Sequence, residues 1–119
     1  MNREVPTLFI DLLERIGNQD HSALTELYAQ TSPLLAVYIR RVVKDTWNAD
    51  EVLQDVYIYI WLNAGAYRRE RGTPMAWFYM LARSRALDSL RRDRKDWLVL
   101  GLDEQVRPRQ AADGGGRAS

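Results

Sequence analysis

The sequence predicts an all-α fold, a small bundle of about four helices followed by a C-terminal linker. Apolar residues recur at helical spacing through most of residues 1–96, and no stretch alternates apolar and polar residues as a half-buried strand would. Helix-start residues stand before three of these apolar stretches. The 119-residue chain has room for one domain whose core needs neither disulfides nor a metal ion. We expect the domain over residues 1–96, and a linker or disordered end over residues 97–119, where the composition turns rich in Gly, Ala and Arg.

Composition excludes several classes of function. The chain has no cysteine and one histidine, His21, which excludes a disulfide scaffold, a zinc site and a cysteine nucleophile. We expect His21, at a helix start, to be a solvated surface residue. No apolar run approaches the length of a membrane span, and the first residues lack the layout of a signal peptide, so we expect a cytoplasmic protein. No carboxylate pair, nucleophile with its base, or metal-ligand set stands out, so we expect neither an enzyme nor a cofactor.

The net charge of +1 conceals a strong segregation of charge along the chain. Residues 1–65 carry five Lys or Arg against nine Asp or Glu, a net charge of −4. Residues 66–95 carry nine basic residues against three acidic ones, a net charge of +6. Such asymmetry predicts two different partners, one of them a polyanion.

The first two helices are expected over residues 6–16 and from residue 21 to about residue 44. Apolar residues at helical spacing predict the first helix, and Gly17 ends it. Asp20 is the candidate N-cap of the second. Within that second stretch Ser32 and Pro33 restart or kink the helix, because proline has no N–H to donate.

Asn48 is the candidate N-cap of a third helix, with Glu51 reaching back to complete a capping box. The core side of this helix comprises Val52, Leu53, Val56, Tyr57, Tyr59, Ile60 and Trp61. The opposite face is polar around one apolar residue, and comprises Asp50, Glu51, Gln54 and Asp55 around Ile58, with Leu62 at its margin. An apolar side chain ringed by carboxylates is typical of an interface anchor, so this face predicts a protein contact. A plain solvated acidic face is the alternative.

A loop over residues 63–72, with two glycines, a tyrosine and three arginines, precedes the last helix. Thr73 is the candidate N-cap of that helix and Pro74 its first residue, and we expect it to run to about Lys95. The apolar arc of its wheel, expected to face the core, comprises Tyr79, Met80, Ala82, Ala86, Leu87 and Leu90. The polar arc comprises Ser84, Arg85, Asp88, Arg91, Arg92 and Lys95.

Two residues of the last helix break this pattern. Trp77 falls on the polar arc, which predicts a contact residue. The alternative is that another element covers Trp77, and Leu81 on the same side favours it. Arg83 falls in the apolar arc, where we expect its stem to lie on the core and its guanidinium group to be paired.

Three blocks of the sequence resemble region 2 of bacterial sigma factors, most closely the small extracytoplasmic-function (ECF) group. The blocks are residues 48–58 with Trp61, residues 71–79 and residues 81–92. They stand in the family's order and separation. Residues 23–43 look like the preceding helix of the same domain, so the resemblance covers most of the chain.

The resemblance implies a transcription initiation domain. It would dock on the clamp helices of the largest catalytic subunit of RNA polymerase and would recognise or melt the −10 promoter element as non-template single-stranded DNA. The polymerase contact would be made by Asp50, Glu51, Gln54, Asp55 and Ile58. The DNA contact would be made by Arg68, Arg69, Arg71, Trp77, Ser84, Arg85, Arg91 and Arg92. An anti-sigma factor, which typically holds such proteins inactive, is a further expected partner.

The residues themselves agree with this function. An acidic face with an apolar anchor suits a basic protein helix. A basic loop beside aromatic residues suits a melted strand, whose phosphates need cations and whose extruded bases need pockets or stacking faces.

Three features depart from the family's pattern. Glu51 stands where the family usually has Asp, which is one methylene shorter, so we expect a slight shift in docking geometry. Ser84 stands where the family often has Asn, so promoter preference does not carry over. No second helical domain for the −35 element (region 4) follows, so the chain is either a fragment cut in a linker or a protein that holds region 2 alone.

Two other functions remain open. A helical adaptor that binds polymerase or a sigma factor without promoter DNA would need the acidic face and not the arginines. A generic basic module would bind duplex DNA without polymerase.

Overall fold

The computed structural model describes residues 4–100 and folds them into four α-helices. These are α1 (Glu4–Gly17), α2 (His21–Val43), α3 (Thr46–Asn63) and α4 (Pro74–Leu100). Two short 3₁₀ turns, η1 (Ala64–Ala66) and η2 (Arg69–Arg71), connect α3 to α4. The predicted all-α class is confirmed. Over residues 4–100, every helix is too short or too polar to cross a membrane.

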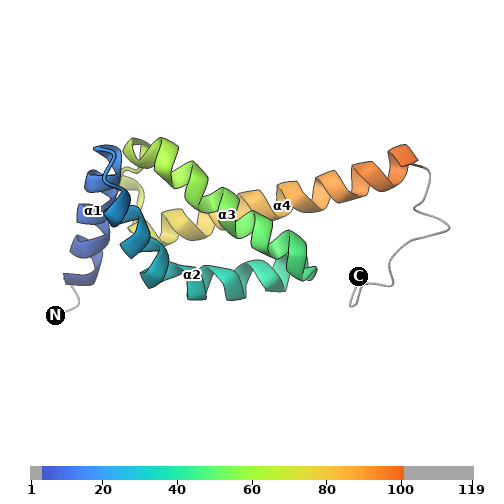
Figure 1. Cartoon of the computed structure of the whole chain (residues 1–119), viewed down its shortest axis with the longest axis horizontal. Coiled ribbons are helices and arrows are strands. Elements are labelled where there is room, and N and C mark those ends of the chain that lie inside the picture. Colours follow the sequence, from blue (N-terminus) through green and yellow to red (C-terminus); the bar gives the residue numbers. More distant parts are fainter. Residues whose placement is uncertain (1–3, 101–119) are drawn as a thin grey trace.

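Three of the helices run together, and the fourth closes one end. Figure 1 shows α2, α3 and α4 along the long axis of the molecule, with α1 across one end beside the start of α4. Helix α4 is the longest and extends past the others at its C-terminal end (Figure 1). The arrangement leaves one face of α3 and much of α4 open to solvent.

Every helix contributes to the core. Its fully buried side chains include Leu12, Ile16, Leu27, Leu35, Ile39, Val52, Val56, Ile60 and Phe78. Phe9 of α1 and Phe78 of α4 pack edge to face, with ring centroids 6.2 Å apart. Burying one such side chain stabilises the fold by about 1.5–3 kcal/mol. The core therefore decides which faces of α3 and α4 remain outside.

Helix α2 is continuous through Pro33 but bends near its middle (Figure 1). Its predicted N-cap is confirmed, since the Asp20 carboxylate accepts hydrogen bonds from the backbone N–H groups of Ser22 and Ala23. The kink has two causes. Pro33 cannot donate to the carbonyl one turn earlier, and the Thr31 hydroxyl donates back to the Leu27 carbonyl at 2.7 Å.

The hydroxyl of Thr31 also ties α2 to α3. Because it donates to Leu27, it accepts from the hydroxyl of Tyr57, 2.5 Å away. Both residues are buried, with 1 % of Thr31 and 5 % of Tyr57 exposed. Burial raises the pKa of Tyr57 to about 12, so this hydroxyl stays protonated and keeps the link at physiological pH.

The expected N-cap of α3 is wrong, because the helix begins two residues before Asn48, at Thr46. Asp45 is the N-cap, and its carboxylate accepts from the backbone N–H of Trp47 at 3.0 Å. Asn48 instead lies in the first turn, where its amide donates to Asp45 and, across to α4, to Asp93. A carboxylate that reaches its own helix N-terminus also interacts with the helix dipole, so Asp45 is the stronger cap.

The predicted start of α4 is confirmed, and its predicted core face is right for Ala82 and Ala86 but wrong for Met80 and Leu90. Thr73 accepts from the N–H of Ala76 at 3.1 Å, and Pro74 is the first helical residue. The buried face comprises Pro74, Phe78, Leu81, Ala82, Ala86 and Ser89. Met80 and Leu90 of the expected apolar arc are exposed, at 56 % and 38 %.

The buried face of α4 is rotated relative to the predicted arc. Phe78 and Leu81, which lie outside that arc, are buried together with the small residues Ala82 and Ala86 within it. Arg83 is also exposed, against expectation, and its head has no ion pair or hydrogen bond recorded with the described residues. The helix continues past Lys95 to Leu100, and the rest of the expected linker lies outside the described residues.

Candidate protein and nucleic-acid interfaces

The acidic face of α3 is assembled as predicted. Asp50, Glu51 and Gln54 are exposed and Asp55 is half-buried, while the apolar Ile58 among them is 55 % exposed. Leu62, at the margin, is 70 % exposed. An ion pair of 3.9 Å reaches this face from Arg40 of α2 to Asp50. All five predicted polymerase-binding residues therefore share one side of the bundle.

The loop between α3 and α4 is folded by its own hydrogen bonds. The hydroxyl of Tyr67 donates to the Gly72 carbonyl at 2.7 Å, and the guanidinium of Arg68 donates to the carbonyls of Gly65 and Tyr67. Gly72 has a φ of 141°, a region that favours glycine. The loop thus holds a defined shape without any partner.

A pocket of about 330 Å³ lies between this loop and the first turns of α4. It is lined by Ala66, Tyr67, Arg68, Arg71, Gly72, Thr73, Ala76, Trp77 and Met80. We call it the loop pocket. It combines two aromatic rings with two arginines, of which Arg71 has no side-chain partner recorded within the described residues.

Trp77 is neither fully exposed nor covered. It is half-buried, and its ring lies 5.6 Å from that of Tyr67 and 6.5 Å from that of Tyr59, centroid to centroid. The alternative that another element covers Trp77 is therefore partly confirmed, since α3 and the loop hold the ring, while its role as a contact residue stays a prediction and one side of it lines the loop pocket. Tyr59 was assigned only to the core by its place on the wheel, and its contact with Trp77 needed the three-dimensional packing.

The remaining predicted DNA-binding residues are spread out. Ser84 is exposed but lies one helical turn beyond Met80, outside the loop pocket. Arg91 is exposed and donates to Asp88 at 2.9 Å, and Arg92 is exposed. Arg85 is half-buried, with its guanidinium 4.7 Å from the centre of the Tyr59 ring and 3.9 Å from Asp88. Arg85 is therefore held in place by the domain itself, which the sequence did not indicate.

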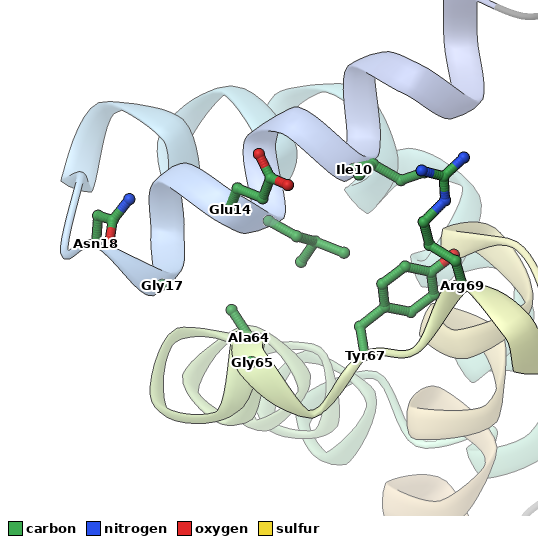
Figure 2. Close-up of a pocket in the computed structure, with 9 residues that line it drawn as sticks. Ile10, Glu14, Gly17, Asn18, Ala64, Gly65, Tyr67 and Arg69 are labelled. Atoms are coloured by element: carbon green, nitrogen blue, oxygen red, sulfur yellow. The ribbon is translucent and has the colours of Figure 1, made fainter.

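Arg69 belongs to a second hollow, on the α1 side of Tyr67. Figure 2 shows it between α1 and the loop, with Ile10 and Glu14 on one side and Ala64, Tyr67 and Arg69 on the other. Its volume is about 470 Å³. Arg69 thus lies apart from Arg68 and Arg71, with Tyr67 forming a wall between them.

One polar link joins the two surfaces. Asn48, at the start of the acidic face, donates to Asp93 of α4 at 3.0 Å. Burial of its carboxyl raises the pKa of Asp93, and the negative charges of Asp45 and Asp96 act in the same direction. No group of three or more potential metal ligands occurs within residues 4–100.

The family model described as Sigma-70 region 2 matches residues 27–96, from the second turn of α2 to the exposed part of α4. The chain belongs to the Sigma-70 region 2 family. The match includes the acidic face, the loop pocket and every predicted site residue. It leaves α1 outside, although α1 contributes Leu12 and Ile16 to the core.

Curated relatives agree with this family. The chain is 36 % identical over 80 residues to the ECF RNA polymerase sigma factor SigK of Mycobacterium sp. strain KMS, covering 67 % of this chain and 42 % of the relative. It is 32 % identical over 80 residues to SigK of Mycobacterium tuberculosis strain H37Rv, covering 67 % of this chain and 43 % of the relative. The region 2 chain thus spans about two fifths of the length of the curated relatives it matches.

Proposed function

We propose that this region 2 domain docks on core RNA polymerase through the acidic face of α3 and binds the −10 promoter element as a non-template single strand. The loop pocket carries the proposal, because Trp77, Arg68 and Arg71 meet there in a hollow of about 330 Å³. An extruded base needs a stacking face and hydrogen-bond donors, and the adjoining phosphates need cations. Such an activity belongs in the cytoplasm, where the polymerase acts.

Docking on polymerase is supported by the chemistry of α3. Ile58 offers an apolar side chain that a partner can desolvate, and Asp50 and Asp55 supply negative charge around it. This pattern is complementary to a basic helical surface, such as the clamp helices of the polymerase's largest subunit. Complementary charge speeds encounter and sets orientation, while the apolar anchor supplies most of the affinity.

The strand would continue from the loop pocket along the outside of α4. Met80 lies at the pocket edge, Ser84 follows one turn later, and Arg91 two turns after that. Phosphate contacts by exposed arginines would give affinity that falls with salt, and the pocket would give base preference. Unstacking a base costs a few kcal/mol per step, so we expect strand capture in the polymerase complex and not by the domain alone.

Fluorescence anisotropy of labelled single-stranded −10 oligonucleotides tests the proposal. Core polymerase, the domain, and the two together are compared, and we expect strong binding only from the mixture. Asp55→Arg reverses a charge of the acidic face and should weaken assembly with polymerase by about tenfold, a change of about 1.4 kcal/mol. Asp11→Arg makes the same charge change on α1, away from both surfaces, and should leave assembly intact.

The other outcomes separate the competing functions. Assembly with polymerase without capture of the single strand would favour the adaptor. Binding of duplex DNA by the domain alone, at equal affinity with and without polymerase, would favour the generic basic module.

A further inference from the structure

Helix α3 exposes a third large apolar residue that the sequence pattern did not single out. Trp47 is 67 % exposed, more than Ile58, and its ring has no aromatic contact recorded with the described residues. Because α3 begins at Thr46, Trp47 is the second residue of the helix and not part of the preceding turn. Its backbone N–H is fixed by the Asp45 cap, so the direction of its side chain follows the helix.

Trp47 lies in line with the apolar residues of the acidic face. Trp47 and Ile58 are eleven residues apart, which is almost a whole number of helical turns, and Leu62 follows one turn later. Glu51 and Gln54 fill the positions between them. The row from Trp47 to Leu62, the α3 stripe, therefore lies on one side of α3, about 22 Å long at 1.5 Å per residue, with the polar Glu51 and Gln54 between Trp47 and Ile58.

Charge is arranged on both edges of this stripe. Asp50 lies on one edge, where Arg40 of α2 pairs with it at 3.9 Å. Asp55 lies toward the other edge, and Glu51 lies within the stripe. Exposed apolar side chains among carboxylates fit a partner helix that carries apolar residues together with Arg or Lys.

We propose that the α3 stripe from Trp47 to Leu62 is one docking surface for a basic helical surface of polymerase, with Trp47 as its anchor at the α2 end. The inference rests on the proposed function for the identity of the partner. It extends the contact from Asp50 to Trp47, a little less than one helical turn. Tryptophan is among the residues most often found as an interface hot spot. Covering an exposed tryptophan with a partner buries a large apolar surface, which favours binding.

Affinity for core polymerase, and for the isolated clamp-helix fragment of its largest subunit, tests the stripe. Trp47→Ala should weaken both by about tenfold and Leu62→Ala by less, because hot-spot truncations typically exceed 1 kcal/mol. Trp47→Phe should recover much of the affinity. Val37→Ala is the matched control, since Val37 is a similarly exposed apolar residue, at 51 %, on α2. All three side chains are exposed, and circular dichroism checks that each of the four variants folds.

Ile58→Asp separates failure of this inference from failure of the proposed function. If Ile58→Asp weakens docking while Trp47→Ala does not, the contact ends before Trp47; the inference fails and the proposed function stands. If neither change weakens docking, both fail. If Trp47→Ala acts and Ile58→Asp does not, the stripe as one docking surface is overturned. Concentration-dependent dimerisation of the domain, abolished by Trp47→Ala, would assign the stripe to a second copy and would also overturn the proposal.

Discussion

The acidic face of α3 and the basic surface of the loop and α4 lie on the same small bundle but are built differently. The periodicity of a single regular helix, α3, sets the position of each residue in the acidic face. The basic surface combines a loop folded by hydrogen bonds with a helix, and its central ring, Trp77, is held by Tyr67 and Tyr59. The first surface depends on local periodicity and the second on tertiary packing. Loosening the core should therefore harm the second surface first.

Phe78→Ala should have the largest effect on stability, and it should weaken binding at the basic surface more than binding at the acidic face. Phe78 is fully buried and its ring contacts both Phe9 and Trp77. Truncating a buried phenylalanine costs about 3–5 kcal/mol, which urea unfolding followed by circular dichroism would measure. In the fraction that remains folded, capture of single-stranded DNA should weaken more than docking on polymerase.

The control for this change is Val37→Ala, a truncation on the surface of α2, which should alter stability by no more than about 0.5 kcal/mol. A cost for Phe78→Ala below about 1 kcal/mol would mean that α4 does not depend on this core contact. Equal loss of both binding activities would remove the distinction between the two surfaces.

The basic surface itself should divide into a base-reading part and a phosphate-binding part. Trp77→Ala removes a ring of the loop pocket and should lower discrimination between oligonucleotides. Arg91→Ala removes an exposed cation of α4 and should lower affinity for all oligonucleotides about equally, reducing the salt slope by about 0.7 for a single strand. Anisotropy titrations with core polymerase at several salt concentrations measure both effects.

As a control, Arg41→Ala removes an equal charge from an exposed position on α2. It should change neither the discrimination between oligonucleotides nor the salt slope. If Trp77→Ala and Arg91→Ala both bind like the wild type at moderate salt, the basic segment is only a solvated face. The adaptor would then be the better description of the domain.

The sequence predicted the fold class, the start of α4 and the acidic face, because helical periodicity and capping chemistry are local. Prediction from the sequence failed where two residues competed for the same N-cap, and where the packing of helices determined which face is buried. Asn48 with Glu51 formed a plausible capping box, but Asp45, three residues earlier, was the better cap, and this error concealed Trp47. The core face of α4 was misjudged in part, because the packing of the other helices buries the side that carries Phe78 and Leu81 and leaves Met80 and Leu90 exposed, which a wheel of one helix does not show.

The candidate site shows the same division. The five residues of the acidic face meet as expected, but the eight candidate DNA-binding residues do not form one cluster. Arg85 lies on the Tyr59 ring, Arg69 lines the hollow beside α1, and Ser84 lies outside the loop pocket. Sequence spacing alone does not show which side of a folded loop an arginine reaches.

Asp93→Asn should have the smallest effect, and it tests the link between the two surfaces. Burial raises the pKa of Asp93 in the folded state, so folding favours the protonated carboxyl. The resulting contribution to stability is present at low pH and is lost as pH rises through the folded-state pKa, above which the half-buried carboxylate is a cost. An asparagine can still accept the hydrogen bond from Asn48 without that cost. We therefore expect Asp93→Asn to raise the melting temperature slightly at neutral pH and to change it least at a pH below about 4, the ordinary pKa of Asp. Thermal unfolding at the two pH values measures the difference.

A variant that is less stable than the wild type at neutral pH would show that the ionised form of Asp93, through its bond to Asn48, holds α3 and α4 together.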